Sequence, residues 1–95
     1  MAQGMSYRVC RGSWWEVSSA ARAAVALREG LAVEVRGGGV LGWVWPLRGG
    51  GAEVIVGDLL GRGTLVSRGA VPTLEAVETT MGRVAVLARA RLAAV

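Results

Sequence analysis

The residue types that perform most enzymatic chemistry are scarce in this 95-residue chain. It contains no histidine and no lysine, and its eleven basic residues are all arginine. Histidine is the usual general base near neutral pH, and lysine supplies Schiff bases and the phosphate-binding residue of many nucleotide sites. Because both are missing, the sequence predicts a protein that is not an enzyme.

Glu34 and Glu53 form the only pair of acids on expected strands that a fold could bring together for acid–base catalysis. Each alternates with valines, which places it on the solvated face of its strand, where glutamates beside arginines are ordinary surface residues. We therefore expect no catalytic residue. With one cysteine, Cys10, one aspartate, Asp58, and no histidine, the chain also lacks the ligands for a zinc or iron site, so we expect no metal and no cofactor.

Two glycine patterns invite a nucleotide or anion-binding interpretation. Gly37, Gly39 and Gly42 spell GxGxxG, the pattern of dinucleotide-binding turns, which requires a helix N-terminus to bind the pyrophosphate. Residues 40–47 include two tryptophans and a proline and favour a strand instead. The loop 57–63 has glycines suited to an anion-binding nest, but glycines that serve a positive-φ connection are the simpler interpretation.

The basic residues define an alternative function. The net charge of +4 permits an anionic partner, and several arginines precede glycines at expected strand ends. In a meander of strands, Arg36 and Arg62 are expected at one end of the sheet and Arg48 and Arg68 at the other. Two small basic rims give a weaker electrostatic footprint for a duplex than one continuous stripe would.

Length and composition indicate one folded domain over residues 1–95, with residues 1–6 as a flexible lead-in. Hydrophobic residues make up 53% and charged residues 19%, which is typical of a globular chain. One cysteine allows no internal disulfide, and no apolar run approaches the roughly 18 residues of a membrane span. We therefore expect no membrane partner and a cytoplasmic location, or a particle assembled there.

The periodicity predicts an α+β fold, a four-stranded antiparallel meander with an N-terminal and a C-terminal helix. The first helix covers residues 20–29, between an N-cap serine and Gly30. Strands are expected at residues 31–36, 40–47, 52–56 and 64–68; residues 7–17 are ambiguous because Gly12 interrupts them. The last segment opens at Pro72 or Thr73, and its apolar residues share one helical arc: Leu74, Val77, Met81, Val84, Ala88, Leu92 and Val95.

Two features of this fold have alternatives. The last helix could end at Gly82, with residues 83–92 as a strand; we favour one long helix. Residues 30–77 resemble small SH3-like barrels in their meander of short strands, a resemblance of fold that carries no function. An open four-stranded sheet covered by two helices fits the same pattern.

The strand at residues 40–47 is apolar on both faces. One face carries Leu41, Trp43, Trp45 and Leu47, and the other carries Val40, Gly42, Val44 and Pro46. So short a chain has little with which to cover both. Three coverings of this strand are open: other parts of the same chain, another protein chain, or nucleic acid bases stacked on the tryptophans. The adjacent Trp14 and Trp15 add to the case for an interface, because neighbouring side chains of a regular element point to different sides.

These observations predict a non-enzymatic subunit that associates with itself or with a larger protein assembly. It would bury the tryptophan-rich strand, and the interface residues would be Leu41, Trp43, Trp45, Leu47, Trp14 and Trp15. The alternative is a small nucleic-acid-binding module in which the tryptophans stack on bases and Arg36, Arg48, Arg62 and Arg68 bind phosphates.

Overall fold

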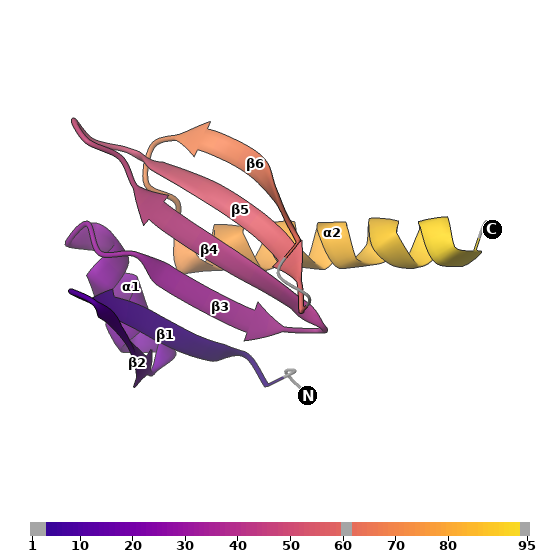
Figure 1. The fold of residues 1–95 in the computed structure, drawn as a ribbon, viewed down its shortest axis with the longest axis horizontal. Coiled ribbons are helices and arrows are strands. Elements are labelled where there is room, and N and C mark those ends of the chain that lie inside the picture. The colour runs from indigo at the N-terminus through magenta and orange to yellow at the C-terminus, as the bar shows by residue number, and fades with distance from the viewer. Residues whose placement is uncertain (1–3, 60–61, 94–95) are drawn as a thin grey trace.

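The computed structural model of the chain describes residues 4–59 and 62–93, with side chains to residue 85 (Figure 1). These residues form six strands and two helices. In chain order they are β1 (Ser6–Arg11), β2 (Trp14–Ser18), α1 (Ala20–Arg28), β3 (Val33–Gly37), β4 (Val40–Pro46), β5 (Ala52–Asp58), β6 (Gly63–Gly69) and α2 (Leu74–Ala93).

The strands form one open antiparallel sheet in the order β2-β1-β3-β4-β5-β6. The α+β class with two helices is confirmed, but the four-stranded meander is corrected to six strands, and the sheet does not close into an SH3-like barrel. The additional strands are β1 and β2. Gly12 interrupts residues 7–17, as expected, but strands lie on both sides of it: at a φ of +69° it forms part of the turn that joins β1 and β2 into a hairpin.

Both helices begin where the sequence places them. The Ser19 hydroxyl accepts a hydrogen bond from the Arg22 N–H at 3.2 Å, which caps α1, and Gly30 follows the helix with a φ of +80°. At the start of α2 the Thr73 hydroxyl accepts from the Ala76 N–H at 3.1 Å. The preference for one long helix is confirmed, because α2 continues through residues 83–92 and extends past the edge of the sheet (Figure 1).

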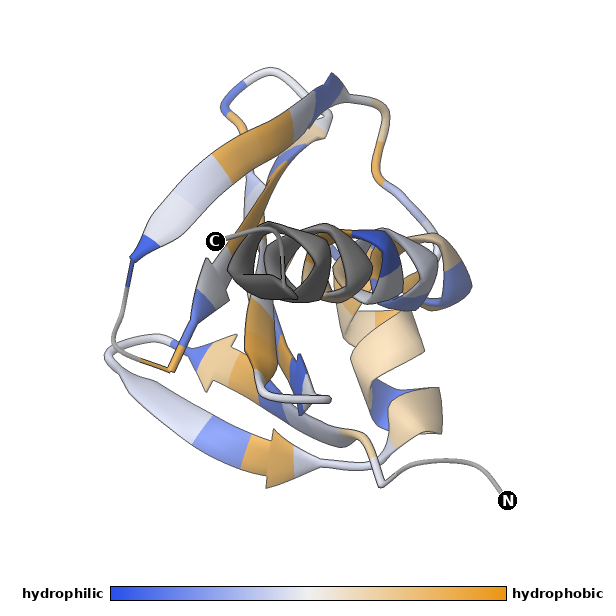
Figure 2. Ribbon diagram, turned by 90° about the vertical axis from the view of Figure 1, so that its right-hand side faces the viewer, coloured by the Kyte–Doolittle hydropathy of each residue, from blue (hydrophilic) through white to orange (hydrophobic). Residues whose placement is uncertain are grey.

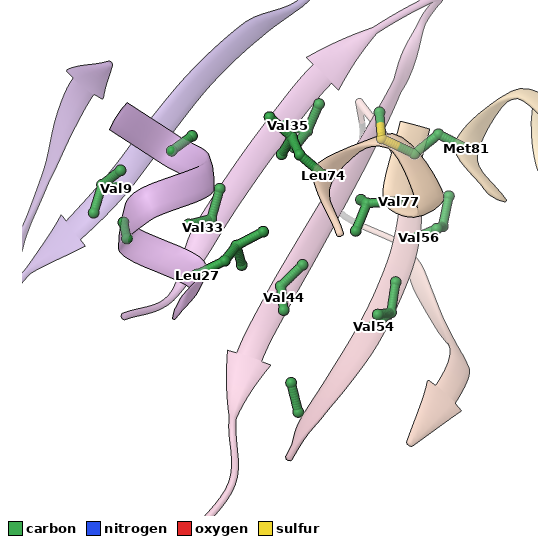
Figure 3. Packing of buried hydrophobic residues seen from close by; sticks show 13 residues of the cluster. Val9, Leu27, Val33, Val35, Val44, Val54, Val56, Leu74, Val77 and Met81 are labelled. Atoms are coloured by element: carbon green, nitrogen blue, oxygen red, sulfur yellow. The ribbon is translucent and has the colours of Figure 1, made fainter. Parts of the chain in front are cut away.

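The two helices cover the same face of the sheet (Figure 2). A row of directly opposed valines crosses this face on the four inner strands, and α1 packs on β1 and β3 while α2 packs on β4 and β5. The core residues are Val9, Val33, Val44, Val54, Val35, Val56, Ala23, Ala26, Leu27, Ala52, Leu74, Val77 and Met81 (Figure 3). Of the apolar arc of α2, Ala88, Leu92 and Val95 lie outside the described side chains.

Gly42 explains how α2 approaches the sheet so closely. A Cβ atom at Gly42 would lie 2.7 Å from Met81 Sδ, closer than side-chain atoms pack, and 3.4 Å from Val77 Cγ1. The glycine therefore provides the space that the fully buried Met81 occupies. The residue that completes the chance GxGxxG pattern serves helix–sheet packing in the middle of β4.

A polar contact connects the first strand to the last helix. The Tyr7 hydroxyl donates a hydrogen bond to Glu78 Oε2 at 2.7 Å. Burial, the hydrogen bond to Glu78 and the negative charge of Glu78 together raise the pKa of Tyr7 to about 12, and burial has the largest effect. Tyr7 therefore stays neutral and fixes β1 against α2.

Candidate interaction surface

The face of the sheet opposite the helices carries Trp15, Trp43 and Trp45, three of the side chains that the sequence marked as functional. We call it the helix-free face. A row of directly opposed residues crosses it on all six strands, from β2 to β6: Val17, Arg8, Glu34, Trp43, Ile55 and Leu65. These residues share a face because alternate residues of a strand point to the same side of the sheet. The row is apolar at both ends and charged in the middle.

Glu34 is the centre of this row and is buried, with 6% of its surface exposed. Arg8 donates to it through two nitrogens, Nε to Oε1 and Nη2 to Oε2, each at 2.8 Å. The Trp43 indole donates to Oε2 at 3.1 Å. Three N–H donors therefore satisfy a carboxylate that would otherwise be expensive to remove from water.

Two tryptophans meet above this cluster although they come from β2 and β4. The rings of Trp15 and Trp45 are 5.8 Å apart between centroids and nearly perpendicular, at 78°. Across the two strands between them, the register places Cys10 and Ala32, whose short side chains leave room for the rings. The Arg8 guanidinium lies 5.6 Å from the Trp15 ring centroid, so the cation joins the ion pair to the aromatic pair.

The predicted interface residues separate into three groups. Trp15, Trp43 and Trp45 come together on the helix-free face; Trp45 is 38% exposed and the other two are half-buried. Leu41 is buried and Leu47 is half-buried, so they offer less surface. Trp14 is 61% exposed but lies on the opposite side of β2, because it is one residue away from Trp15.

Sequence reasoning missed part of this surface. Val17 is 80% exposed and Leu65 is 49% exposed, and both belong to the row described above. The available signal was that Val17 lies two residues after Trp15, the spacing of residues on one face of a strand. This signal is recognisable only when residues 14–18 are interpreted as a strand. The contact of Arg8 with Glu34 had no sequence signal, since 26 residues separate them.

The predicted anion-binding arginines lie at opposite ends of the sheet, as the meander requires. Two of them are already paired: Arg68 with Glu53, and Arg62 with Asp58 at 2.8 Å. Arg36 and Arg48 are exposed and have no ion-pair partner in the described part of the chain. Half of the predicted set therefore has its charge balanced internally.

The candidate catalytic carboxylates do not meet as neighbours. Glu34 lies on β3 and Glu53 on β5, with β4 between them, and an arginine engages each one. Both lie on the face opposite the valines, as expected, but Glu34 is buried there, contrary to the expected solvated position, because Arg8 and Trp43 cover it.

The loop at residues 57–63 contains its own negatively charged group, the carboxylate of Asp58. The Arg62 N–H donates to Asp58 Oδ1 at 3.1 Å, and the Asp58 N–H donates to the Arg62 carbonyl at 3.0 Å. The carboxylate of Asp58 thus accepts the Arg62 N–H, one of the donors that a nest would offer to an anion. Residues 60 and 61 of the proposed nest lie outside the described residues.

Comparison with known proteins finds no match: no family model, no curated protein and no solved structure is similar to this chain. Over the residues that the structure describes, neither helix combines the length and apolarity needed to cross a membrane.

Proposed function

We propose that this chain is a non-enzymatic assembly subunit that associates with a second copy of itself through the helix-free face. The observation that carries the proposal is the exposure of three large apolar side chains on that face: Val17, Trp45 and Leu65. They come from β2, β4 and β6, so they span the whole width of the sheet. Aromatic anchors surrounded by apolar residues are characteristic of protein interfaces.

The charges of this face support a second copy as the partner. Arg8 is paired with Glu34, and Arg68 with Glu53, so both ion pairs are complete within one chain. Arg36, near the end of β3 on the same face, has no ion-pair partner in the described residues, so like-charge repulsion between two such faces comes from Arg36 rather than from the paired arginines. A two-fold contact also needs only one surface that complements itself.

A second copy would meet only the exposed part of this face, because Glu34 and Leu41 are already buried within one chain and the rings of Trp15 and Trp45 already contact each other. It would cover Val17, Trp45 and Leu65 and so remove their apolar surface from water.

Sedimentation equilibrium from low micromolar to near-millimolar concentration tests the proposal. We expect reversible self-association that Trp45→Ala weakens by roughly thirtyfold, since each of the two copies of Trp45 in a two-fold contact contributes about 1 kcal/mol, or about 2 kcal/mol per dimer. Trp14→Ala is the matched control, because Trp14 is more exposed but lies on the other side of β2. A monomer throughout this range, or equal effects of the two substitutions, would overturn the proposal.

The same experiment separates the nucleic-acid alternative. A single-stranded oligonucleotide added at low salt reports binding as an increase in mass. If the oligonucleotide binds, and if this binding weakens steeply with salt and on Trp45→Ala, then nucleic-acid binding replaces self-association as the function of this face.

A further inference from the structure

We propose that the helix-free face contains a binding site for a carboxylate group between Arg8 and Arg36, a site that shares Val17 with the proposed self-association surface. A pocket of about 230 Å³ opens there at the β1–β3 pair. Its lining residues are Ser6, Tyr7, Arg8, Val17, Glu34 and Arg36. Tyr7 directs its hydroxyl to Glu78 on the helix-covered side, so its side chain is not part of the site.

The register of β1 and β3 brings the two arginines together. Arg8 lies directly opposite Glu34, and Ser6 lies directly opposite Arg36. Arg8 and Arg36 are therefore diagonal neighbours on adjacent strands, with Cα atoms roughly 7–8 Å apart in such a pair. Side chains as long as arginine can both reach one oxyanion from these positions, with the Ser6 hydroxyl beside them.

Arg8 is oriented before any ligand arrives. Its Nε and Nη2 atoms bind Glu34, and its guanidinium lies by the ring of Trp15. The remaining nitrogen, Nη1, keeps its two N–H donors. Because the side chain is already held, binding through these donors costs little conformational entropy.

Arg36 supplies the free charge of the site. Its side chain is exposed, and within the described residues no carboxylate pairs with it. A guanidinium fork matches the two oxygens of a carboxylate, so Arg36 can bind in a bidentate manner while Arg8 contributes a further donor.

The charge of the pocket selects the ligand class. Arg8 and Arg36 contribute two positive charges and Glu34 one negative charge, which leaves a net charge of +1. One carboxylate neutralises this charge, whereas a doubly charged phosphate leaves an excess negative charge beside the Glu34 carboxylate. Val17 provides an apolar wall for a short aliphatic chain. The ligand is therefore a small aliphatic carboxylate, either free or as an acidic side chain of a bound protein.

An NMR titration tests the site with sodium acetate, N-acetyl-aspartyl amide and inorganic phosphate, each at ionic strength matched with sodium chloride. We expect saturable shifts of the Ser6 and Arg36 amides and of the Trp43 indole N–H, with acetate or the capped aspartate binding more tightly than phosphate. Tighter binding of acetate indicates a free small acid, and tighter binding of the capped aspartate indicates a protein side chain.

Arg36→Gln should weaken carboxylate binding at least tenfold. Arg48→Gln is the matched control: it removes the same charge from an exposed position at the opposite end of the sheet, and it should leave the affinity within twofold. No saturable shift, tighter binding of phosphate, or equal effects of the two variants would overturn the proposal. The sedimentation behaviour of Arg36→Gln, measured separately, reports on self-association alone.

Discussion

Replacing Arg8 with alanine removes two of the three donors that satisfy the buried carboxylate of Glu34 and leaves only the Trp43 indole. Removing one partner of a fully buried ion pair costs about 3–5 kcal/mol. The Arg8 side chain is 43% exposed, so water reaches Glu34 once the arginine is gone, and the cost falls to about 1–3 kcal/mol. Loss of the Trp15 contact adds about 0.5 kcal/mol. We expect Arg8→Ala to lower the free energy of unfolding by about 1.5–3.5 kcal/mol.

Urea unfolding followed by tryptophan fluorescence measures this loss. With an m-value of about 1 kcal/mol/M for a small domain, the midpoint should fall by roughly 2 M. Arg48→Ala, an exposed arginine with no ion pair in the described residues, should change stability by less than about 0.5 kcal/mol. In a double-mutant cycle with Glu34→Gln, the coupling energy should exceed about 1 kcal/mol. If Arg8→Ala costs no more than Arg48→Ala, the cluster does not stabilise the fold and this reasoning is refuted.

Three further predictions concern the helix-covered face. Met81→Ala should cost about 2–5 kcal/mol in urea unfolding, because Met81 is fully buried. Gly42→Ala should cost about 1–3 kcal/mol, because the added methyl group overpacks against Met81. The double variant should lose less stability than the sum of the two single variants, since the shorter side chain at position 81 leaves space for that methyl group; an additive result would contradict the contact. Tyr7, the only tyrosine, should ionise near pH 12 in a spectrophotometric titration. Because folding raises its pKa from 10.0, its contribution to stability is complete below pH 10 and is lost between pH 10 and 12. An ordinary titration near pH 10 would refute the Glu78 contact.

The helices and the last four strands were predictable because their signals are local. A serine cap and a terminal glycine bound α1, and glycines separate the strands from β3 to β6. The first hairpin was not predictable with the same rules. Gly12 in the middle of an alternating segment is equally consistent with a broken strand or a turn, and only the pairing of β1 with both β2 and β3 distinguishes them.

The candidate surface was predictable only in its aromatic part. The apolar faces of residues 40–47 were assigned correctly, since Val44 is directed to the helices and Trp43 and Trp45 to the other side. The role of Glu34 was not predictable, because it depends on Arg8 and Trp43, which only the strand order brings next to it. Pairings across a sheet have no local sequence signature, so exposure could not be inferred from residue type.

Glu34, on β3, also explains how the neighbouring strand β4, which is apolar on both faces, acquires a defined orientation. A shift of β3 by one residue would turn Glu34 into the valine row between Val9 and Val44 and away from Arg8 and Trp43. An unpaired carboxylate in that environment costs several kcal/mol, in addition to the cost of packing Trp43 and Trp45 against the helices. The charge on β3 therefore contributes to fixing the register of its neighbour β4. Glu34→Leu combined with Arg8→Met should keep the secondary structure and much of the stability, but it should broaden the amide signals in an NMR spectrum as alternative registers become populated. Sharp, single signals from that variant would show that the tryptophans orient β4 without the ion pair.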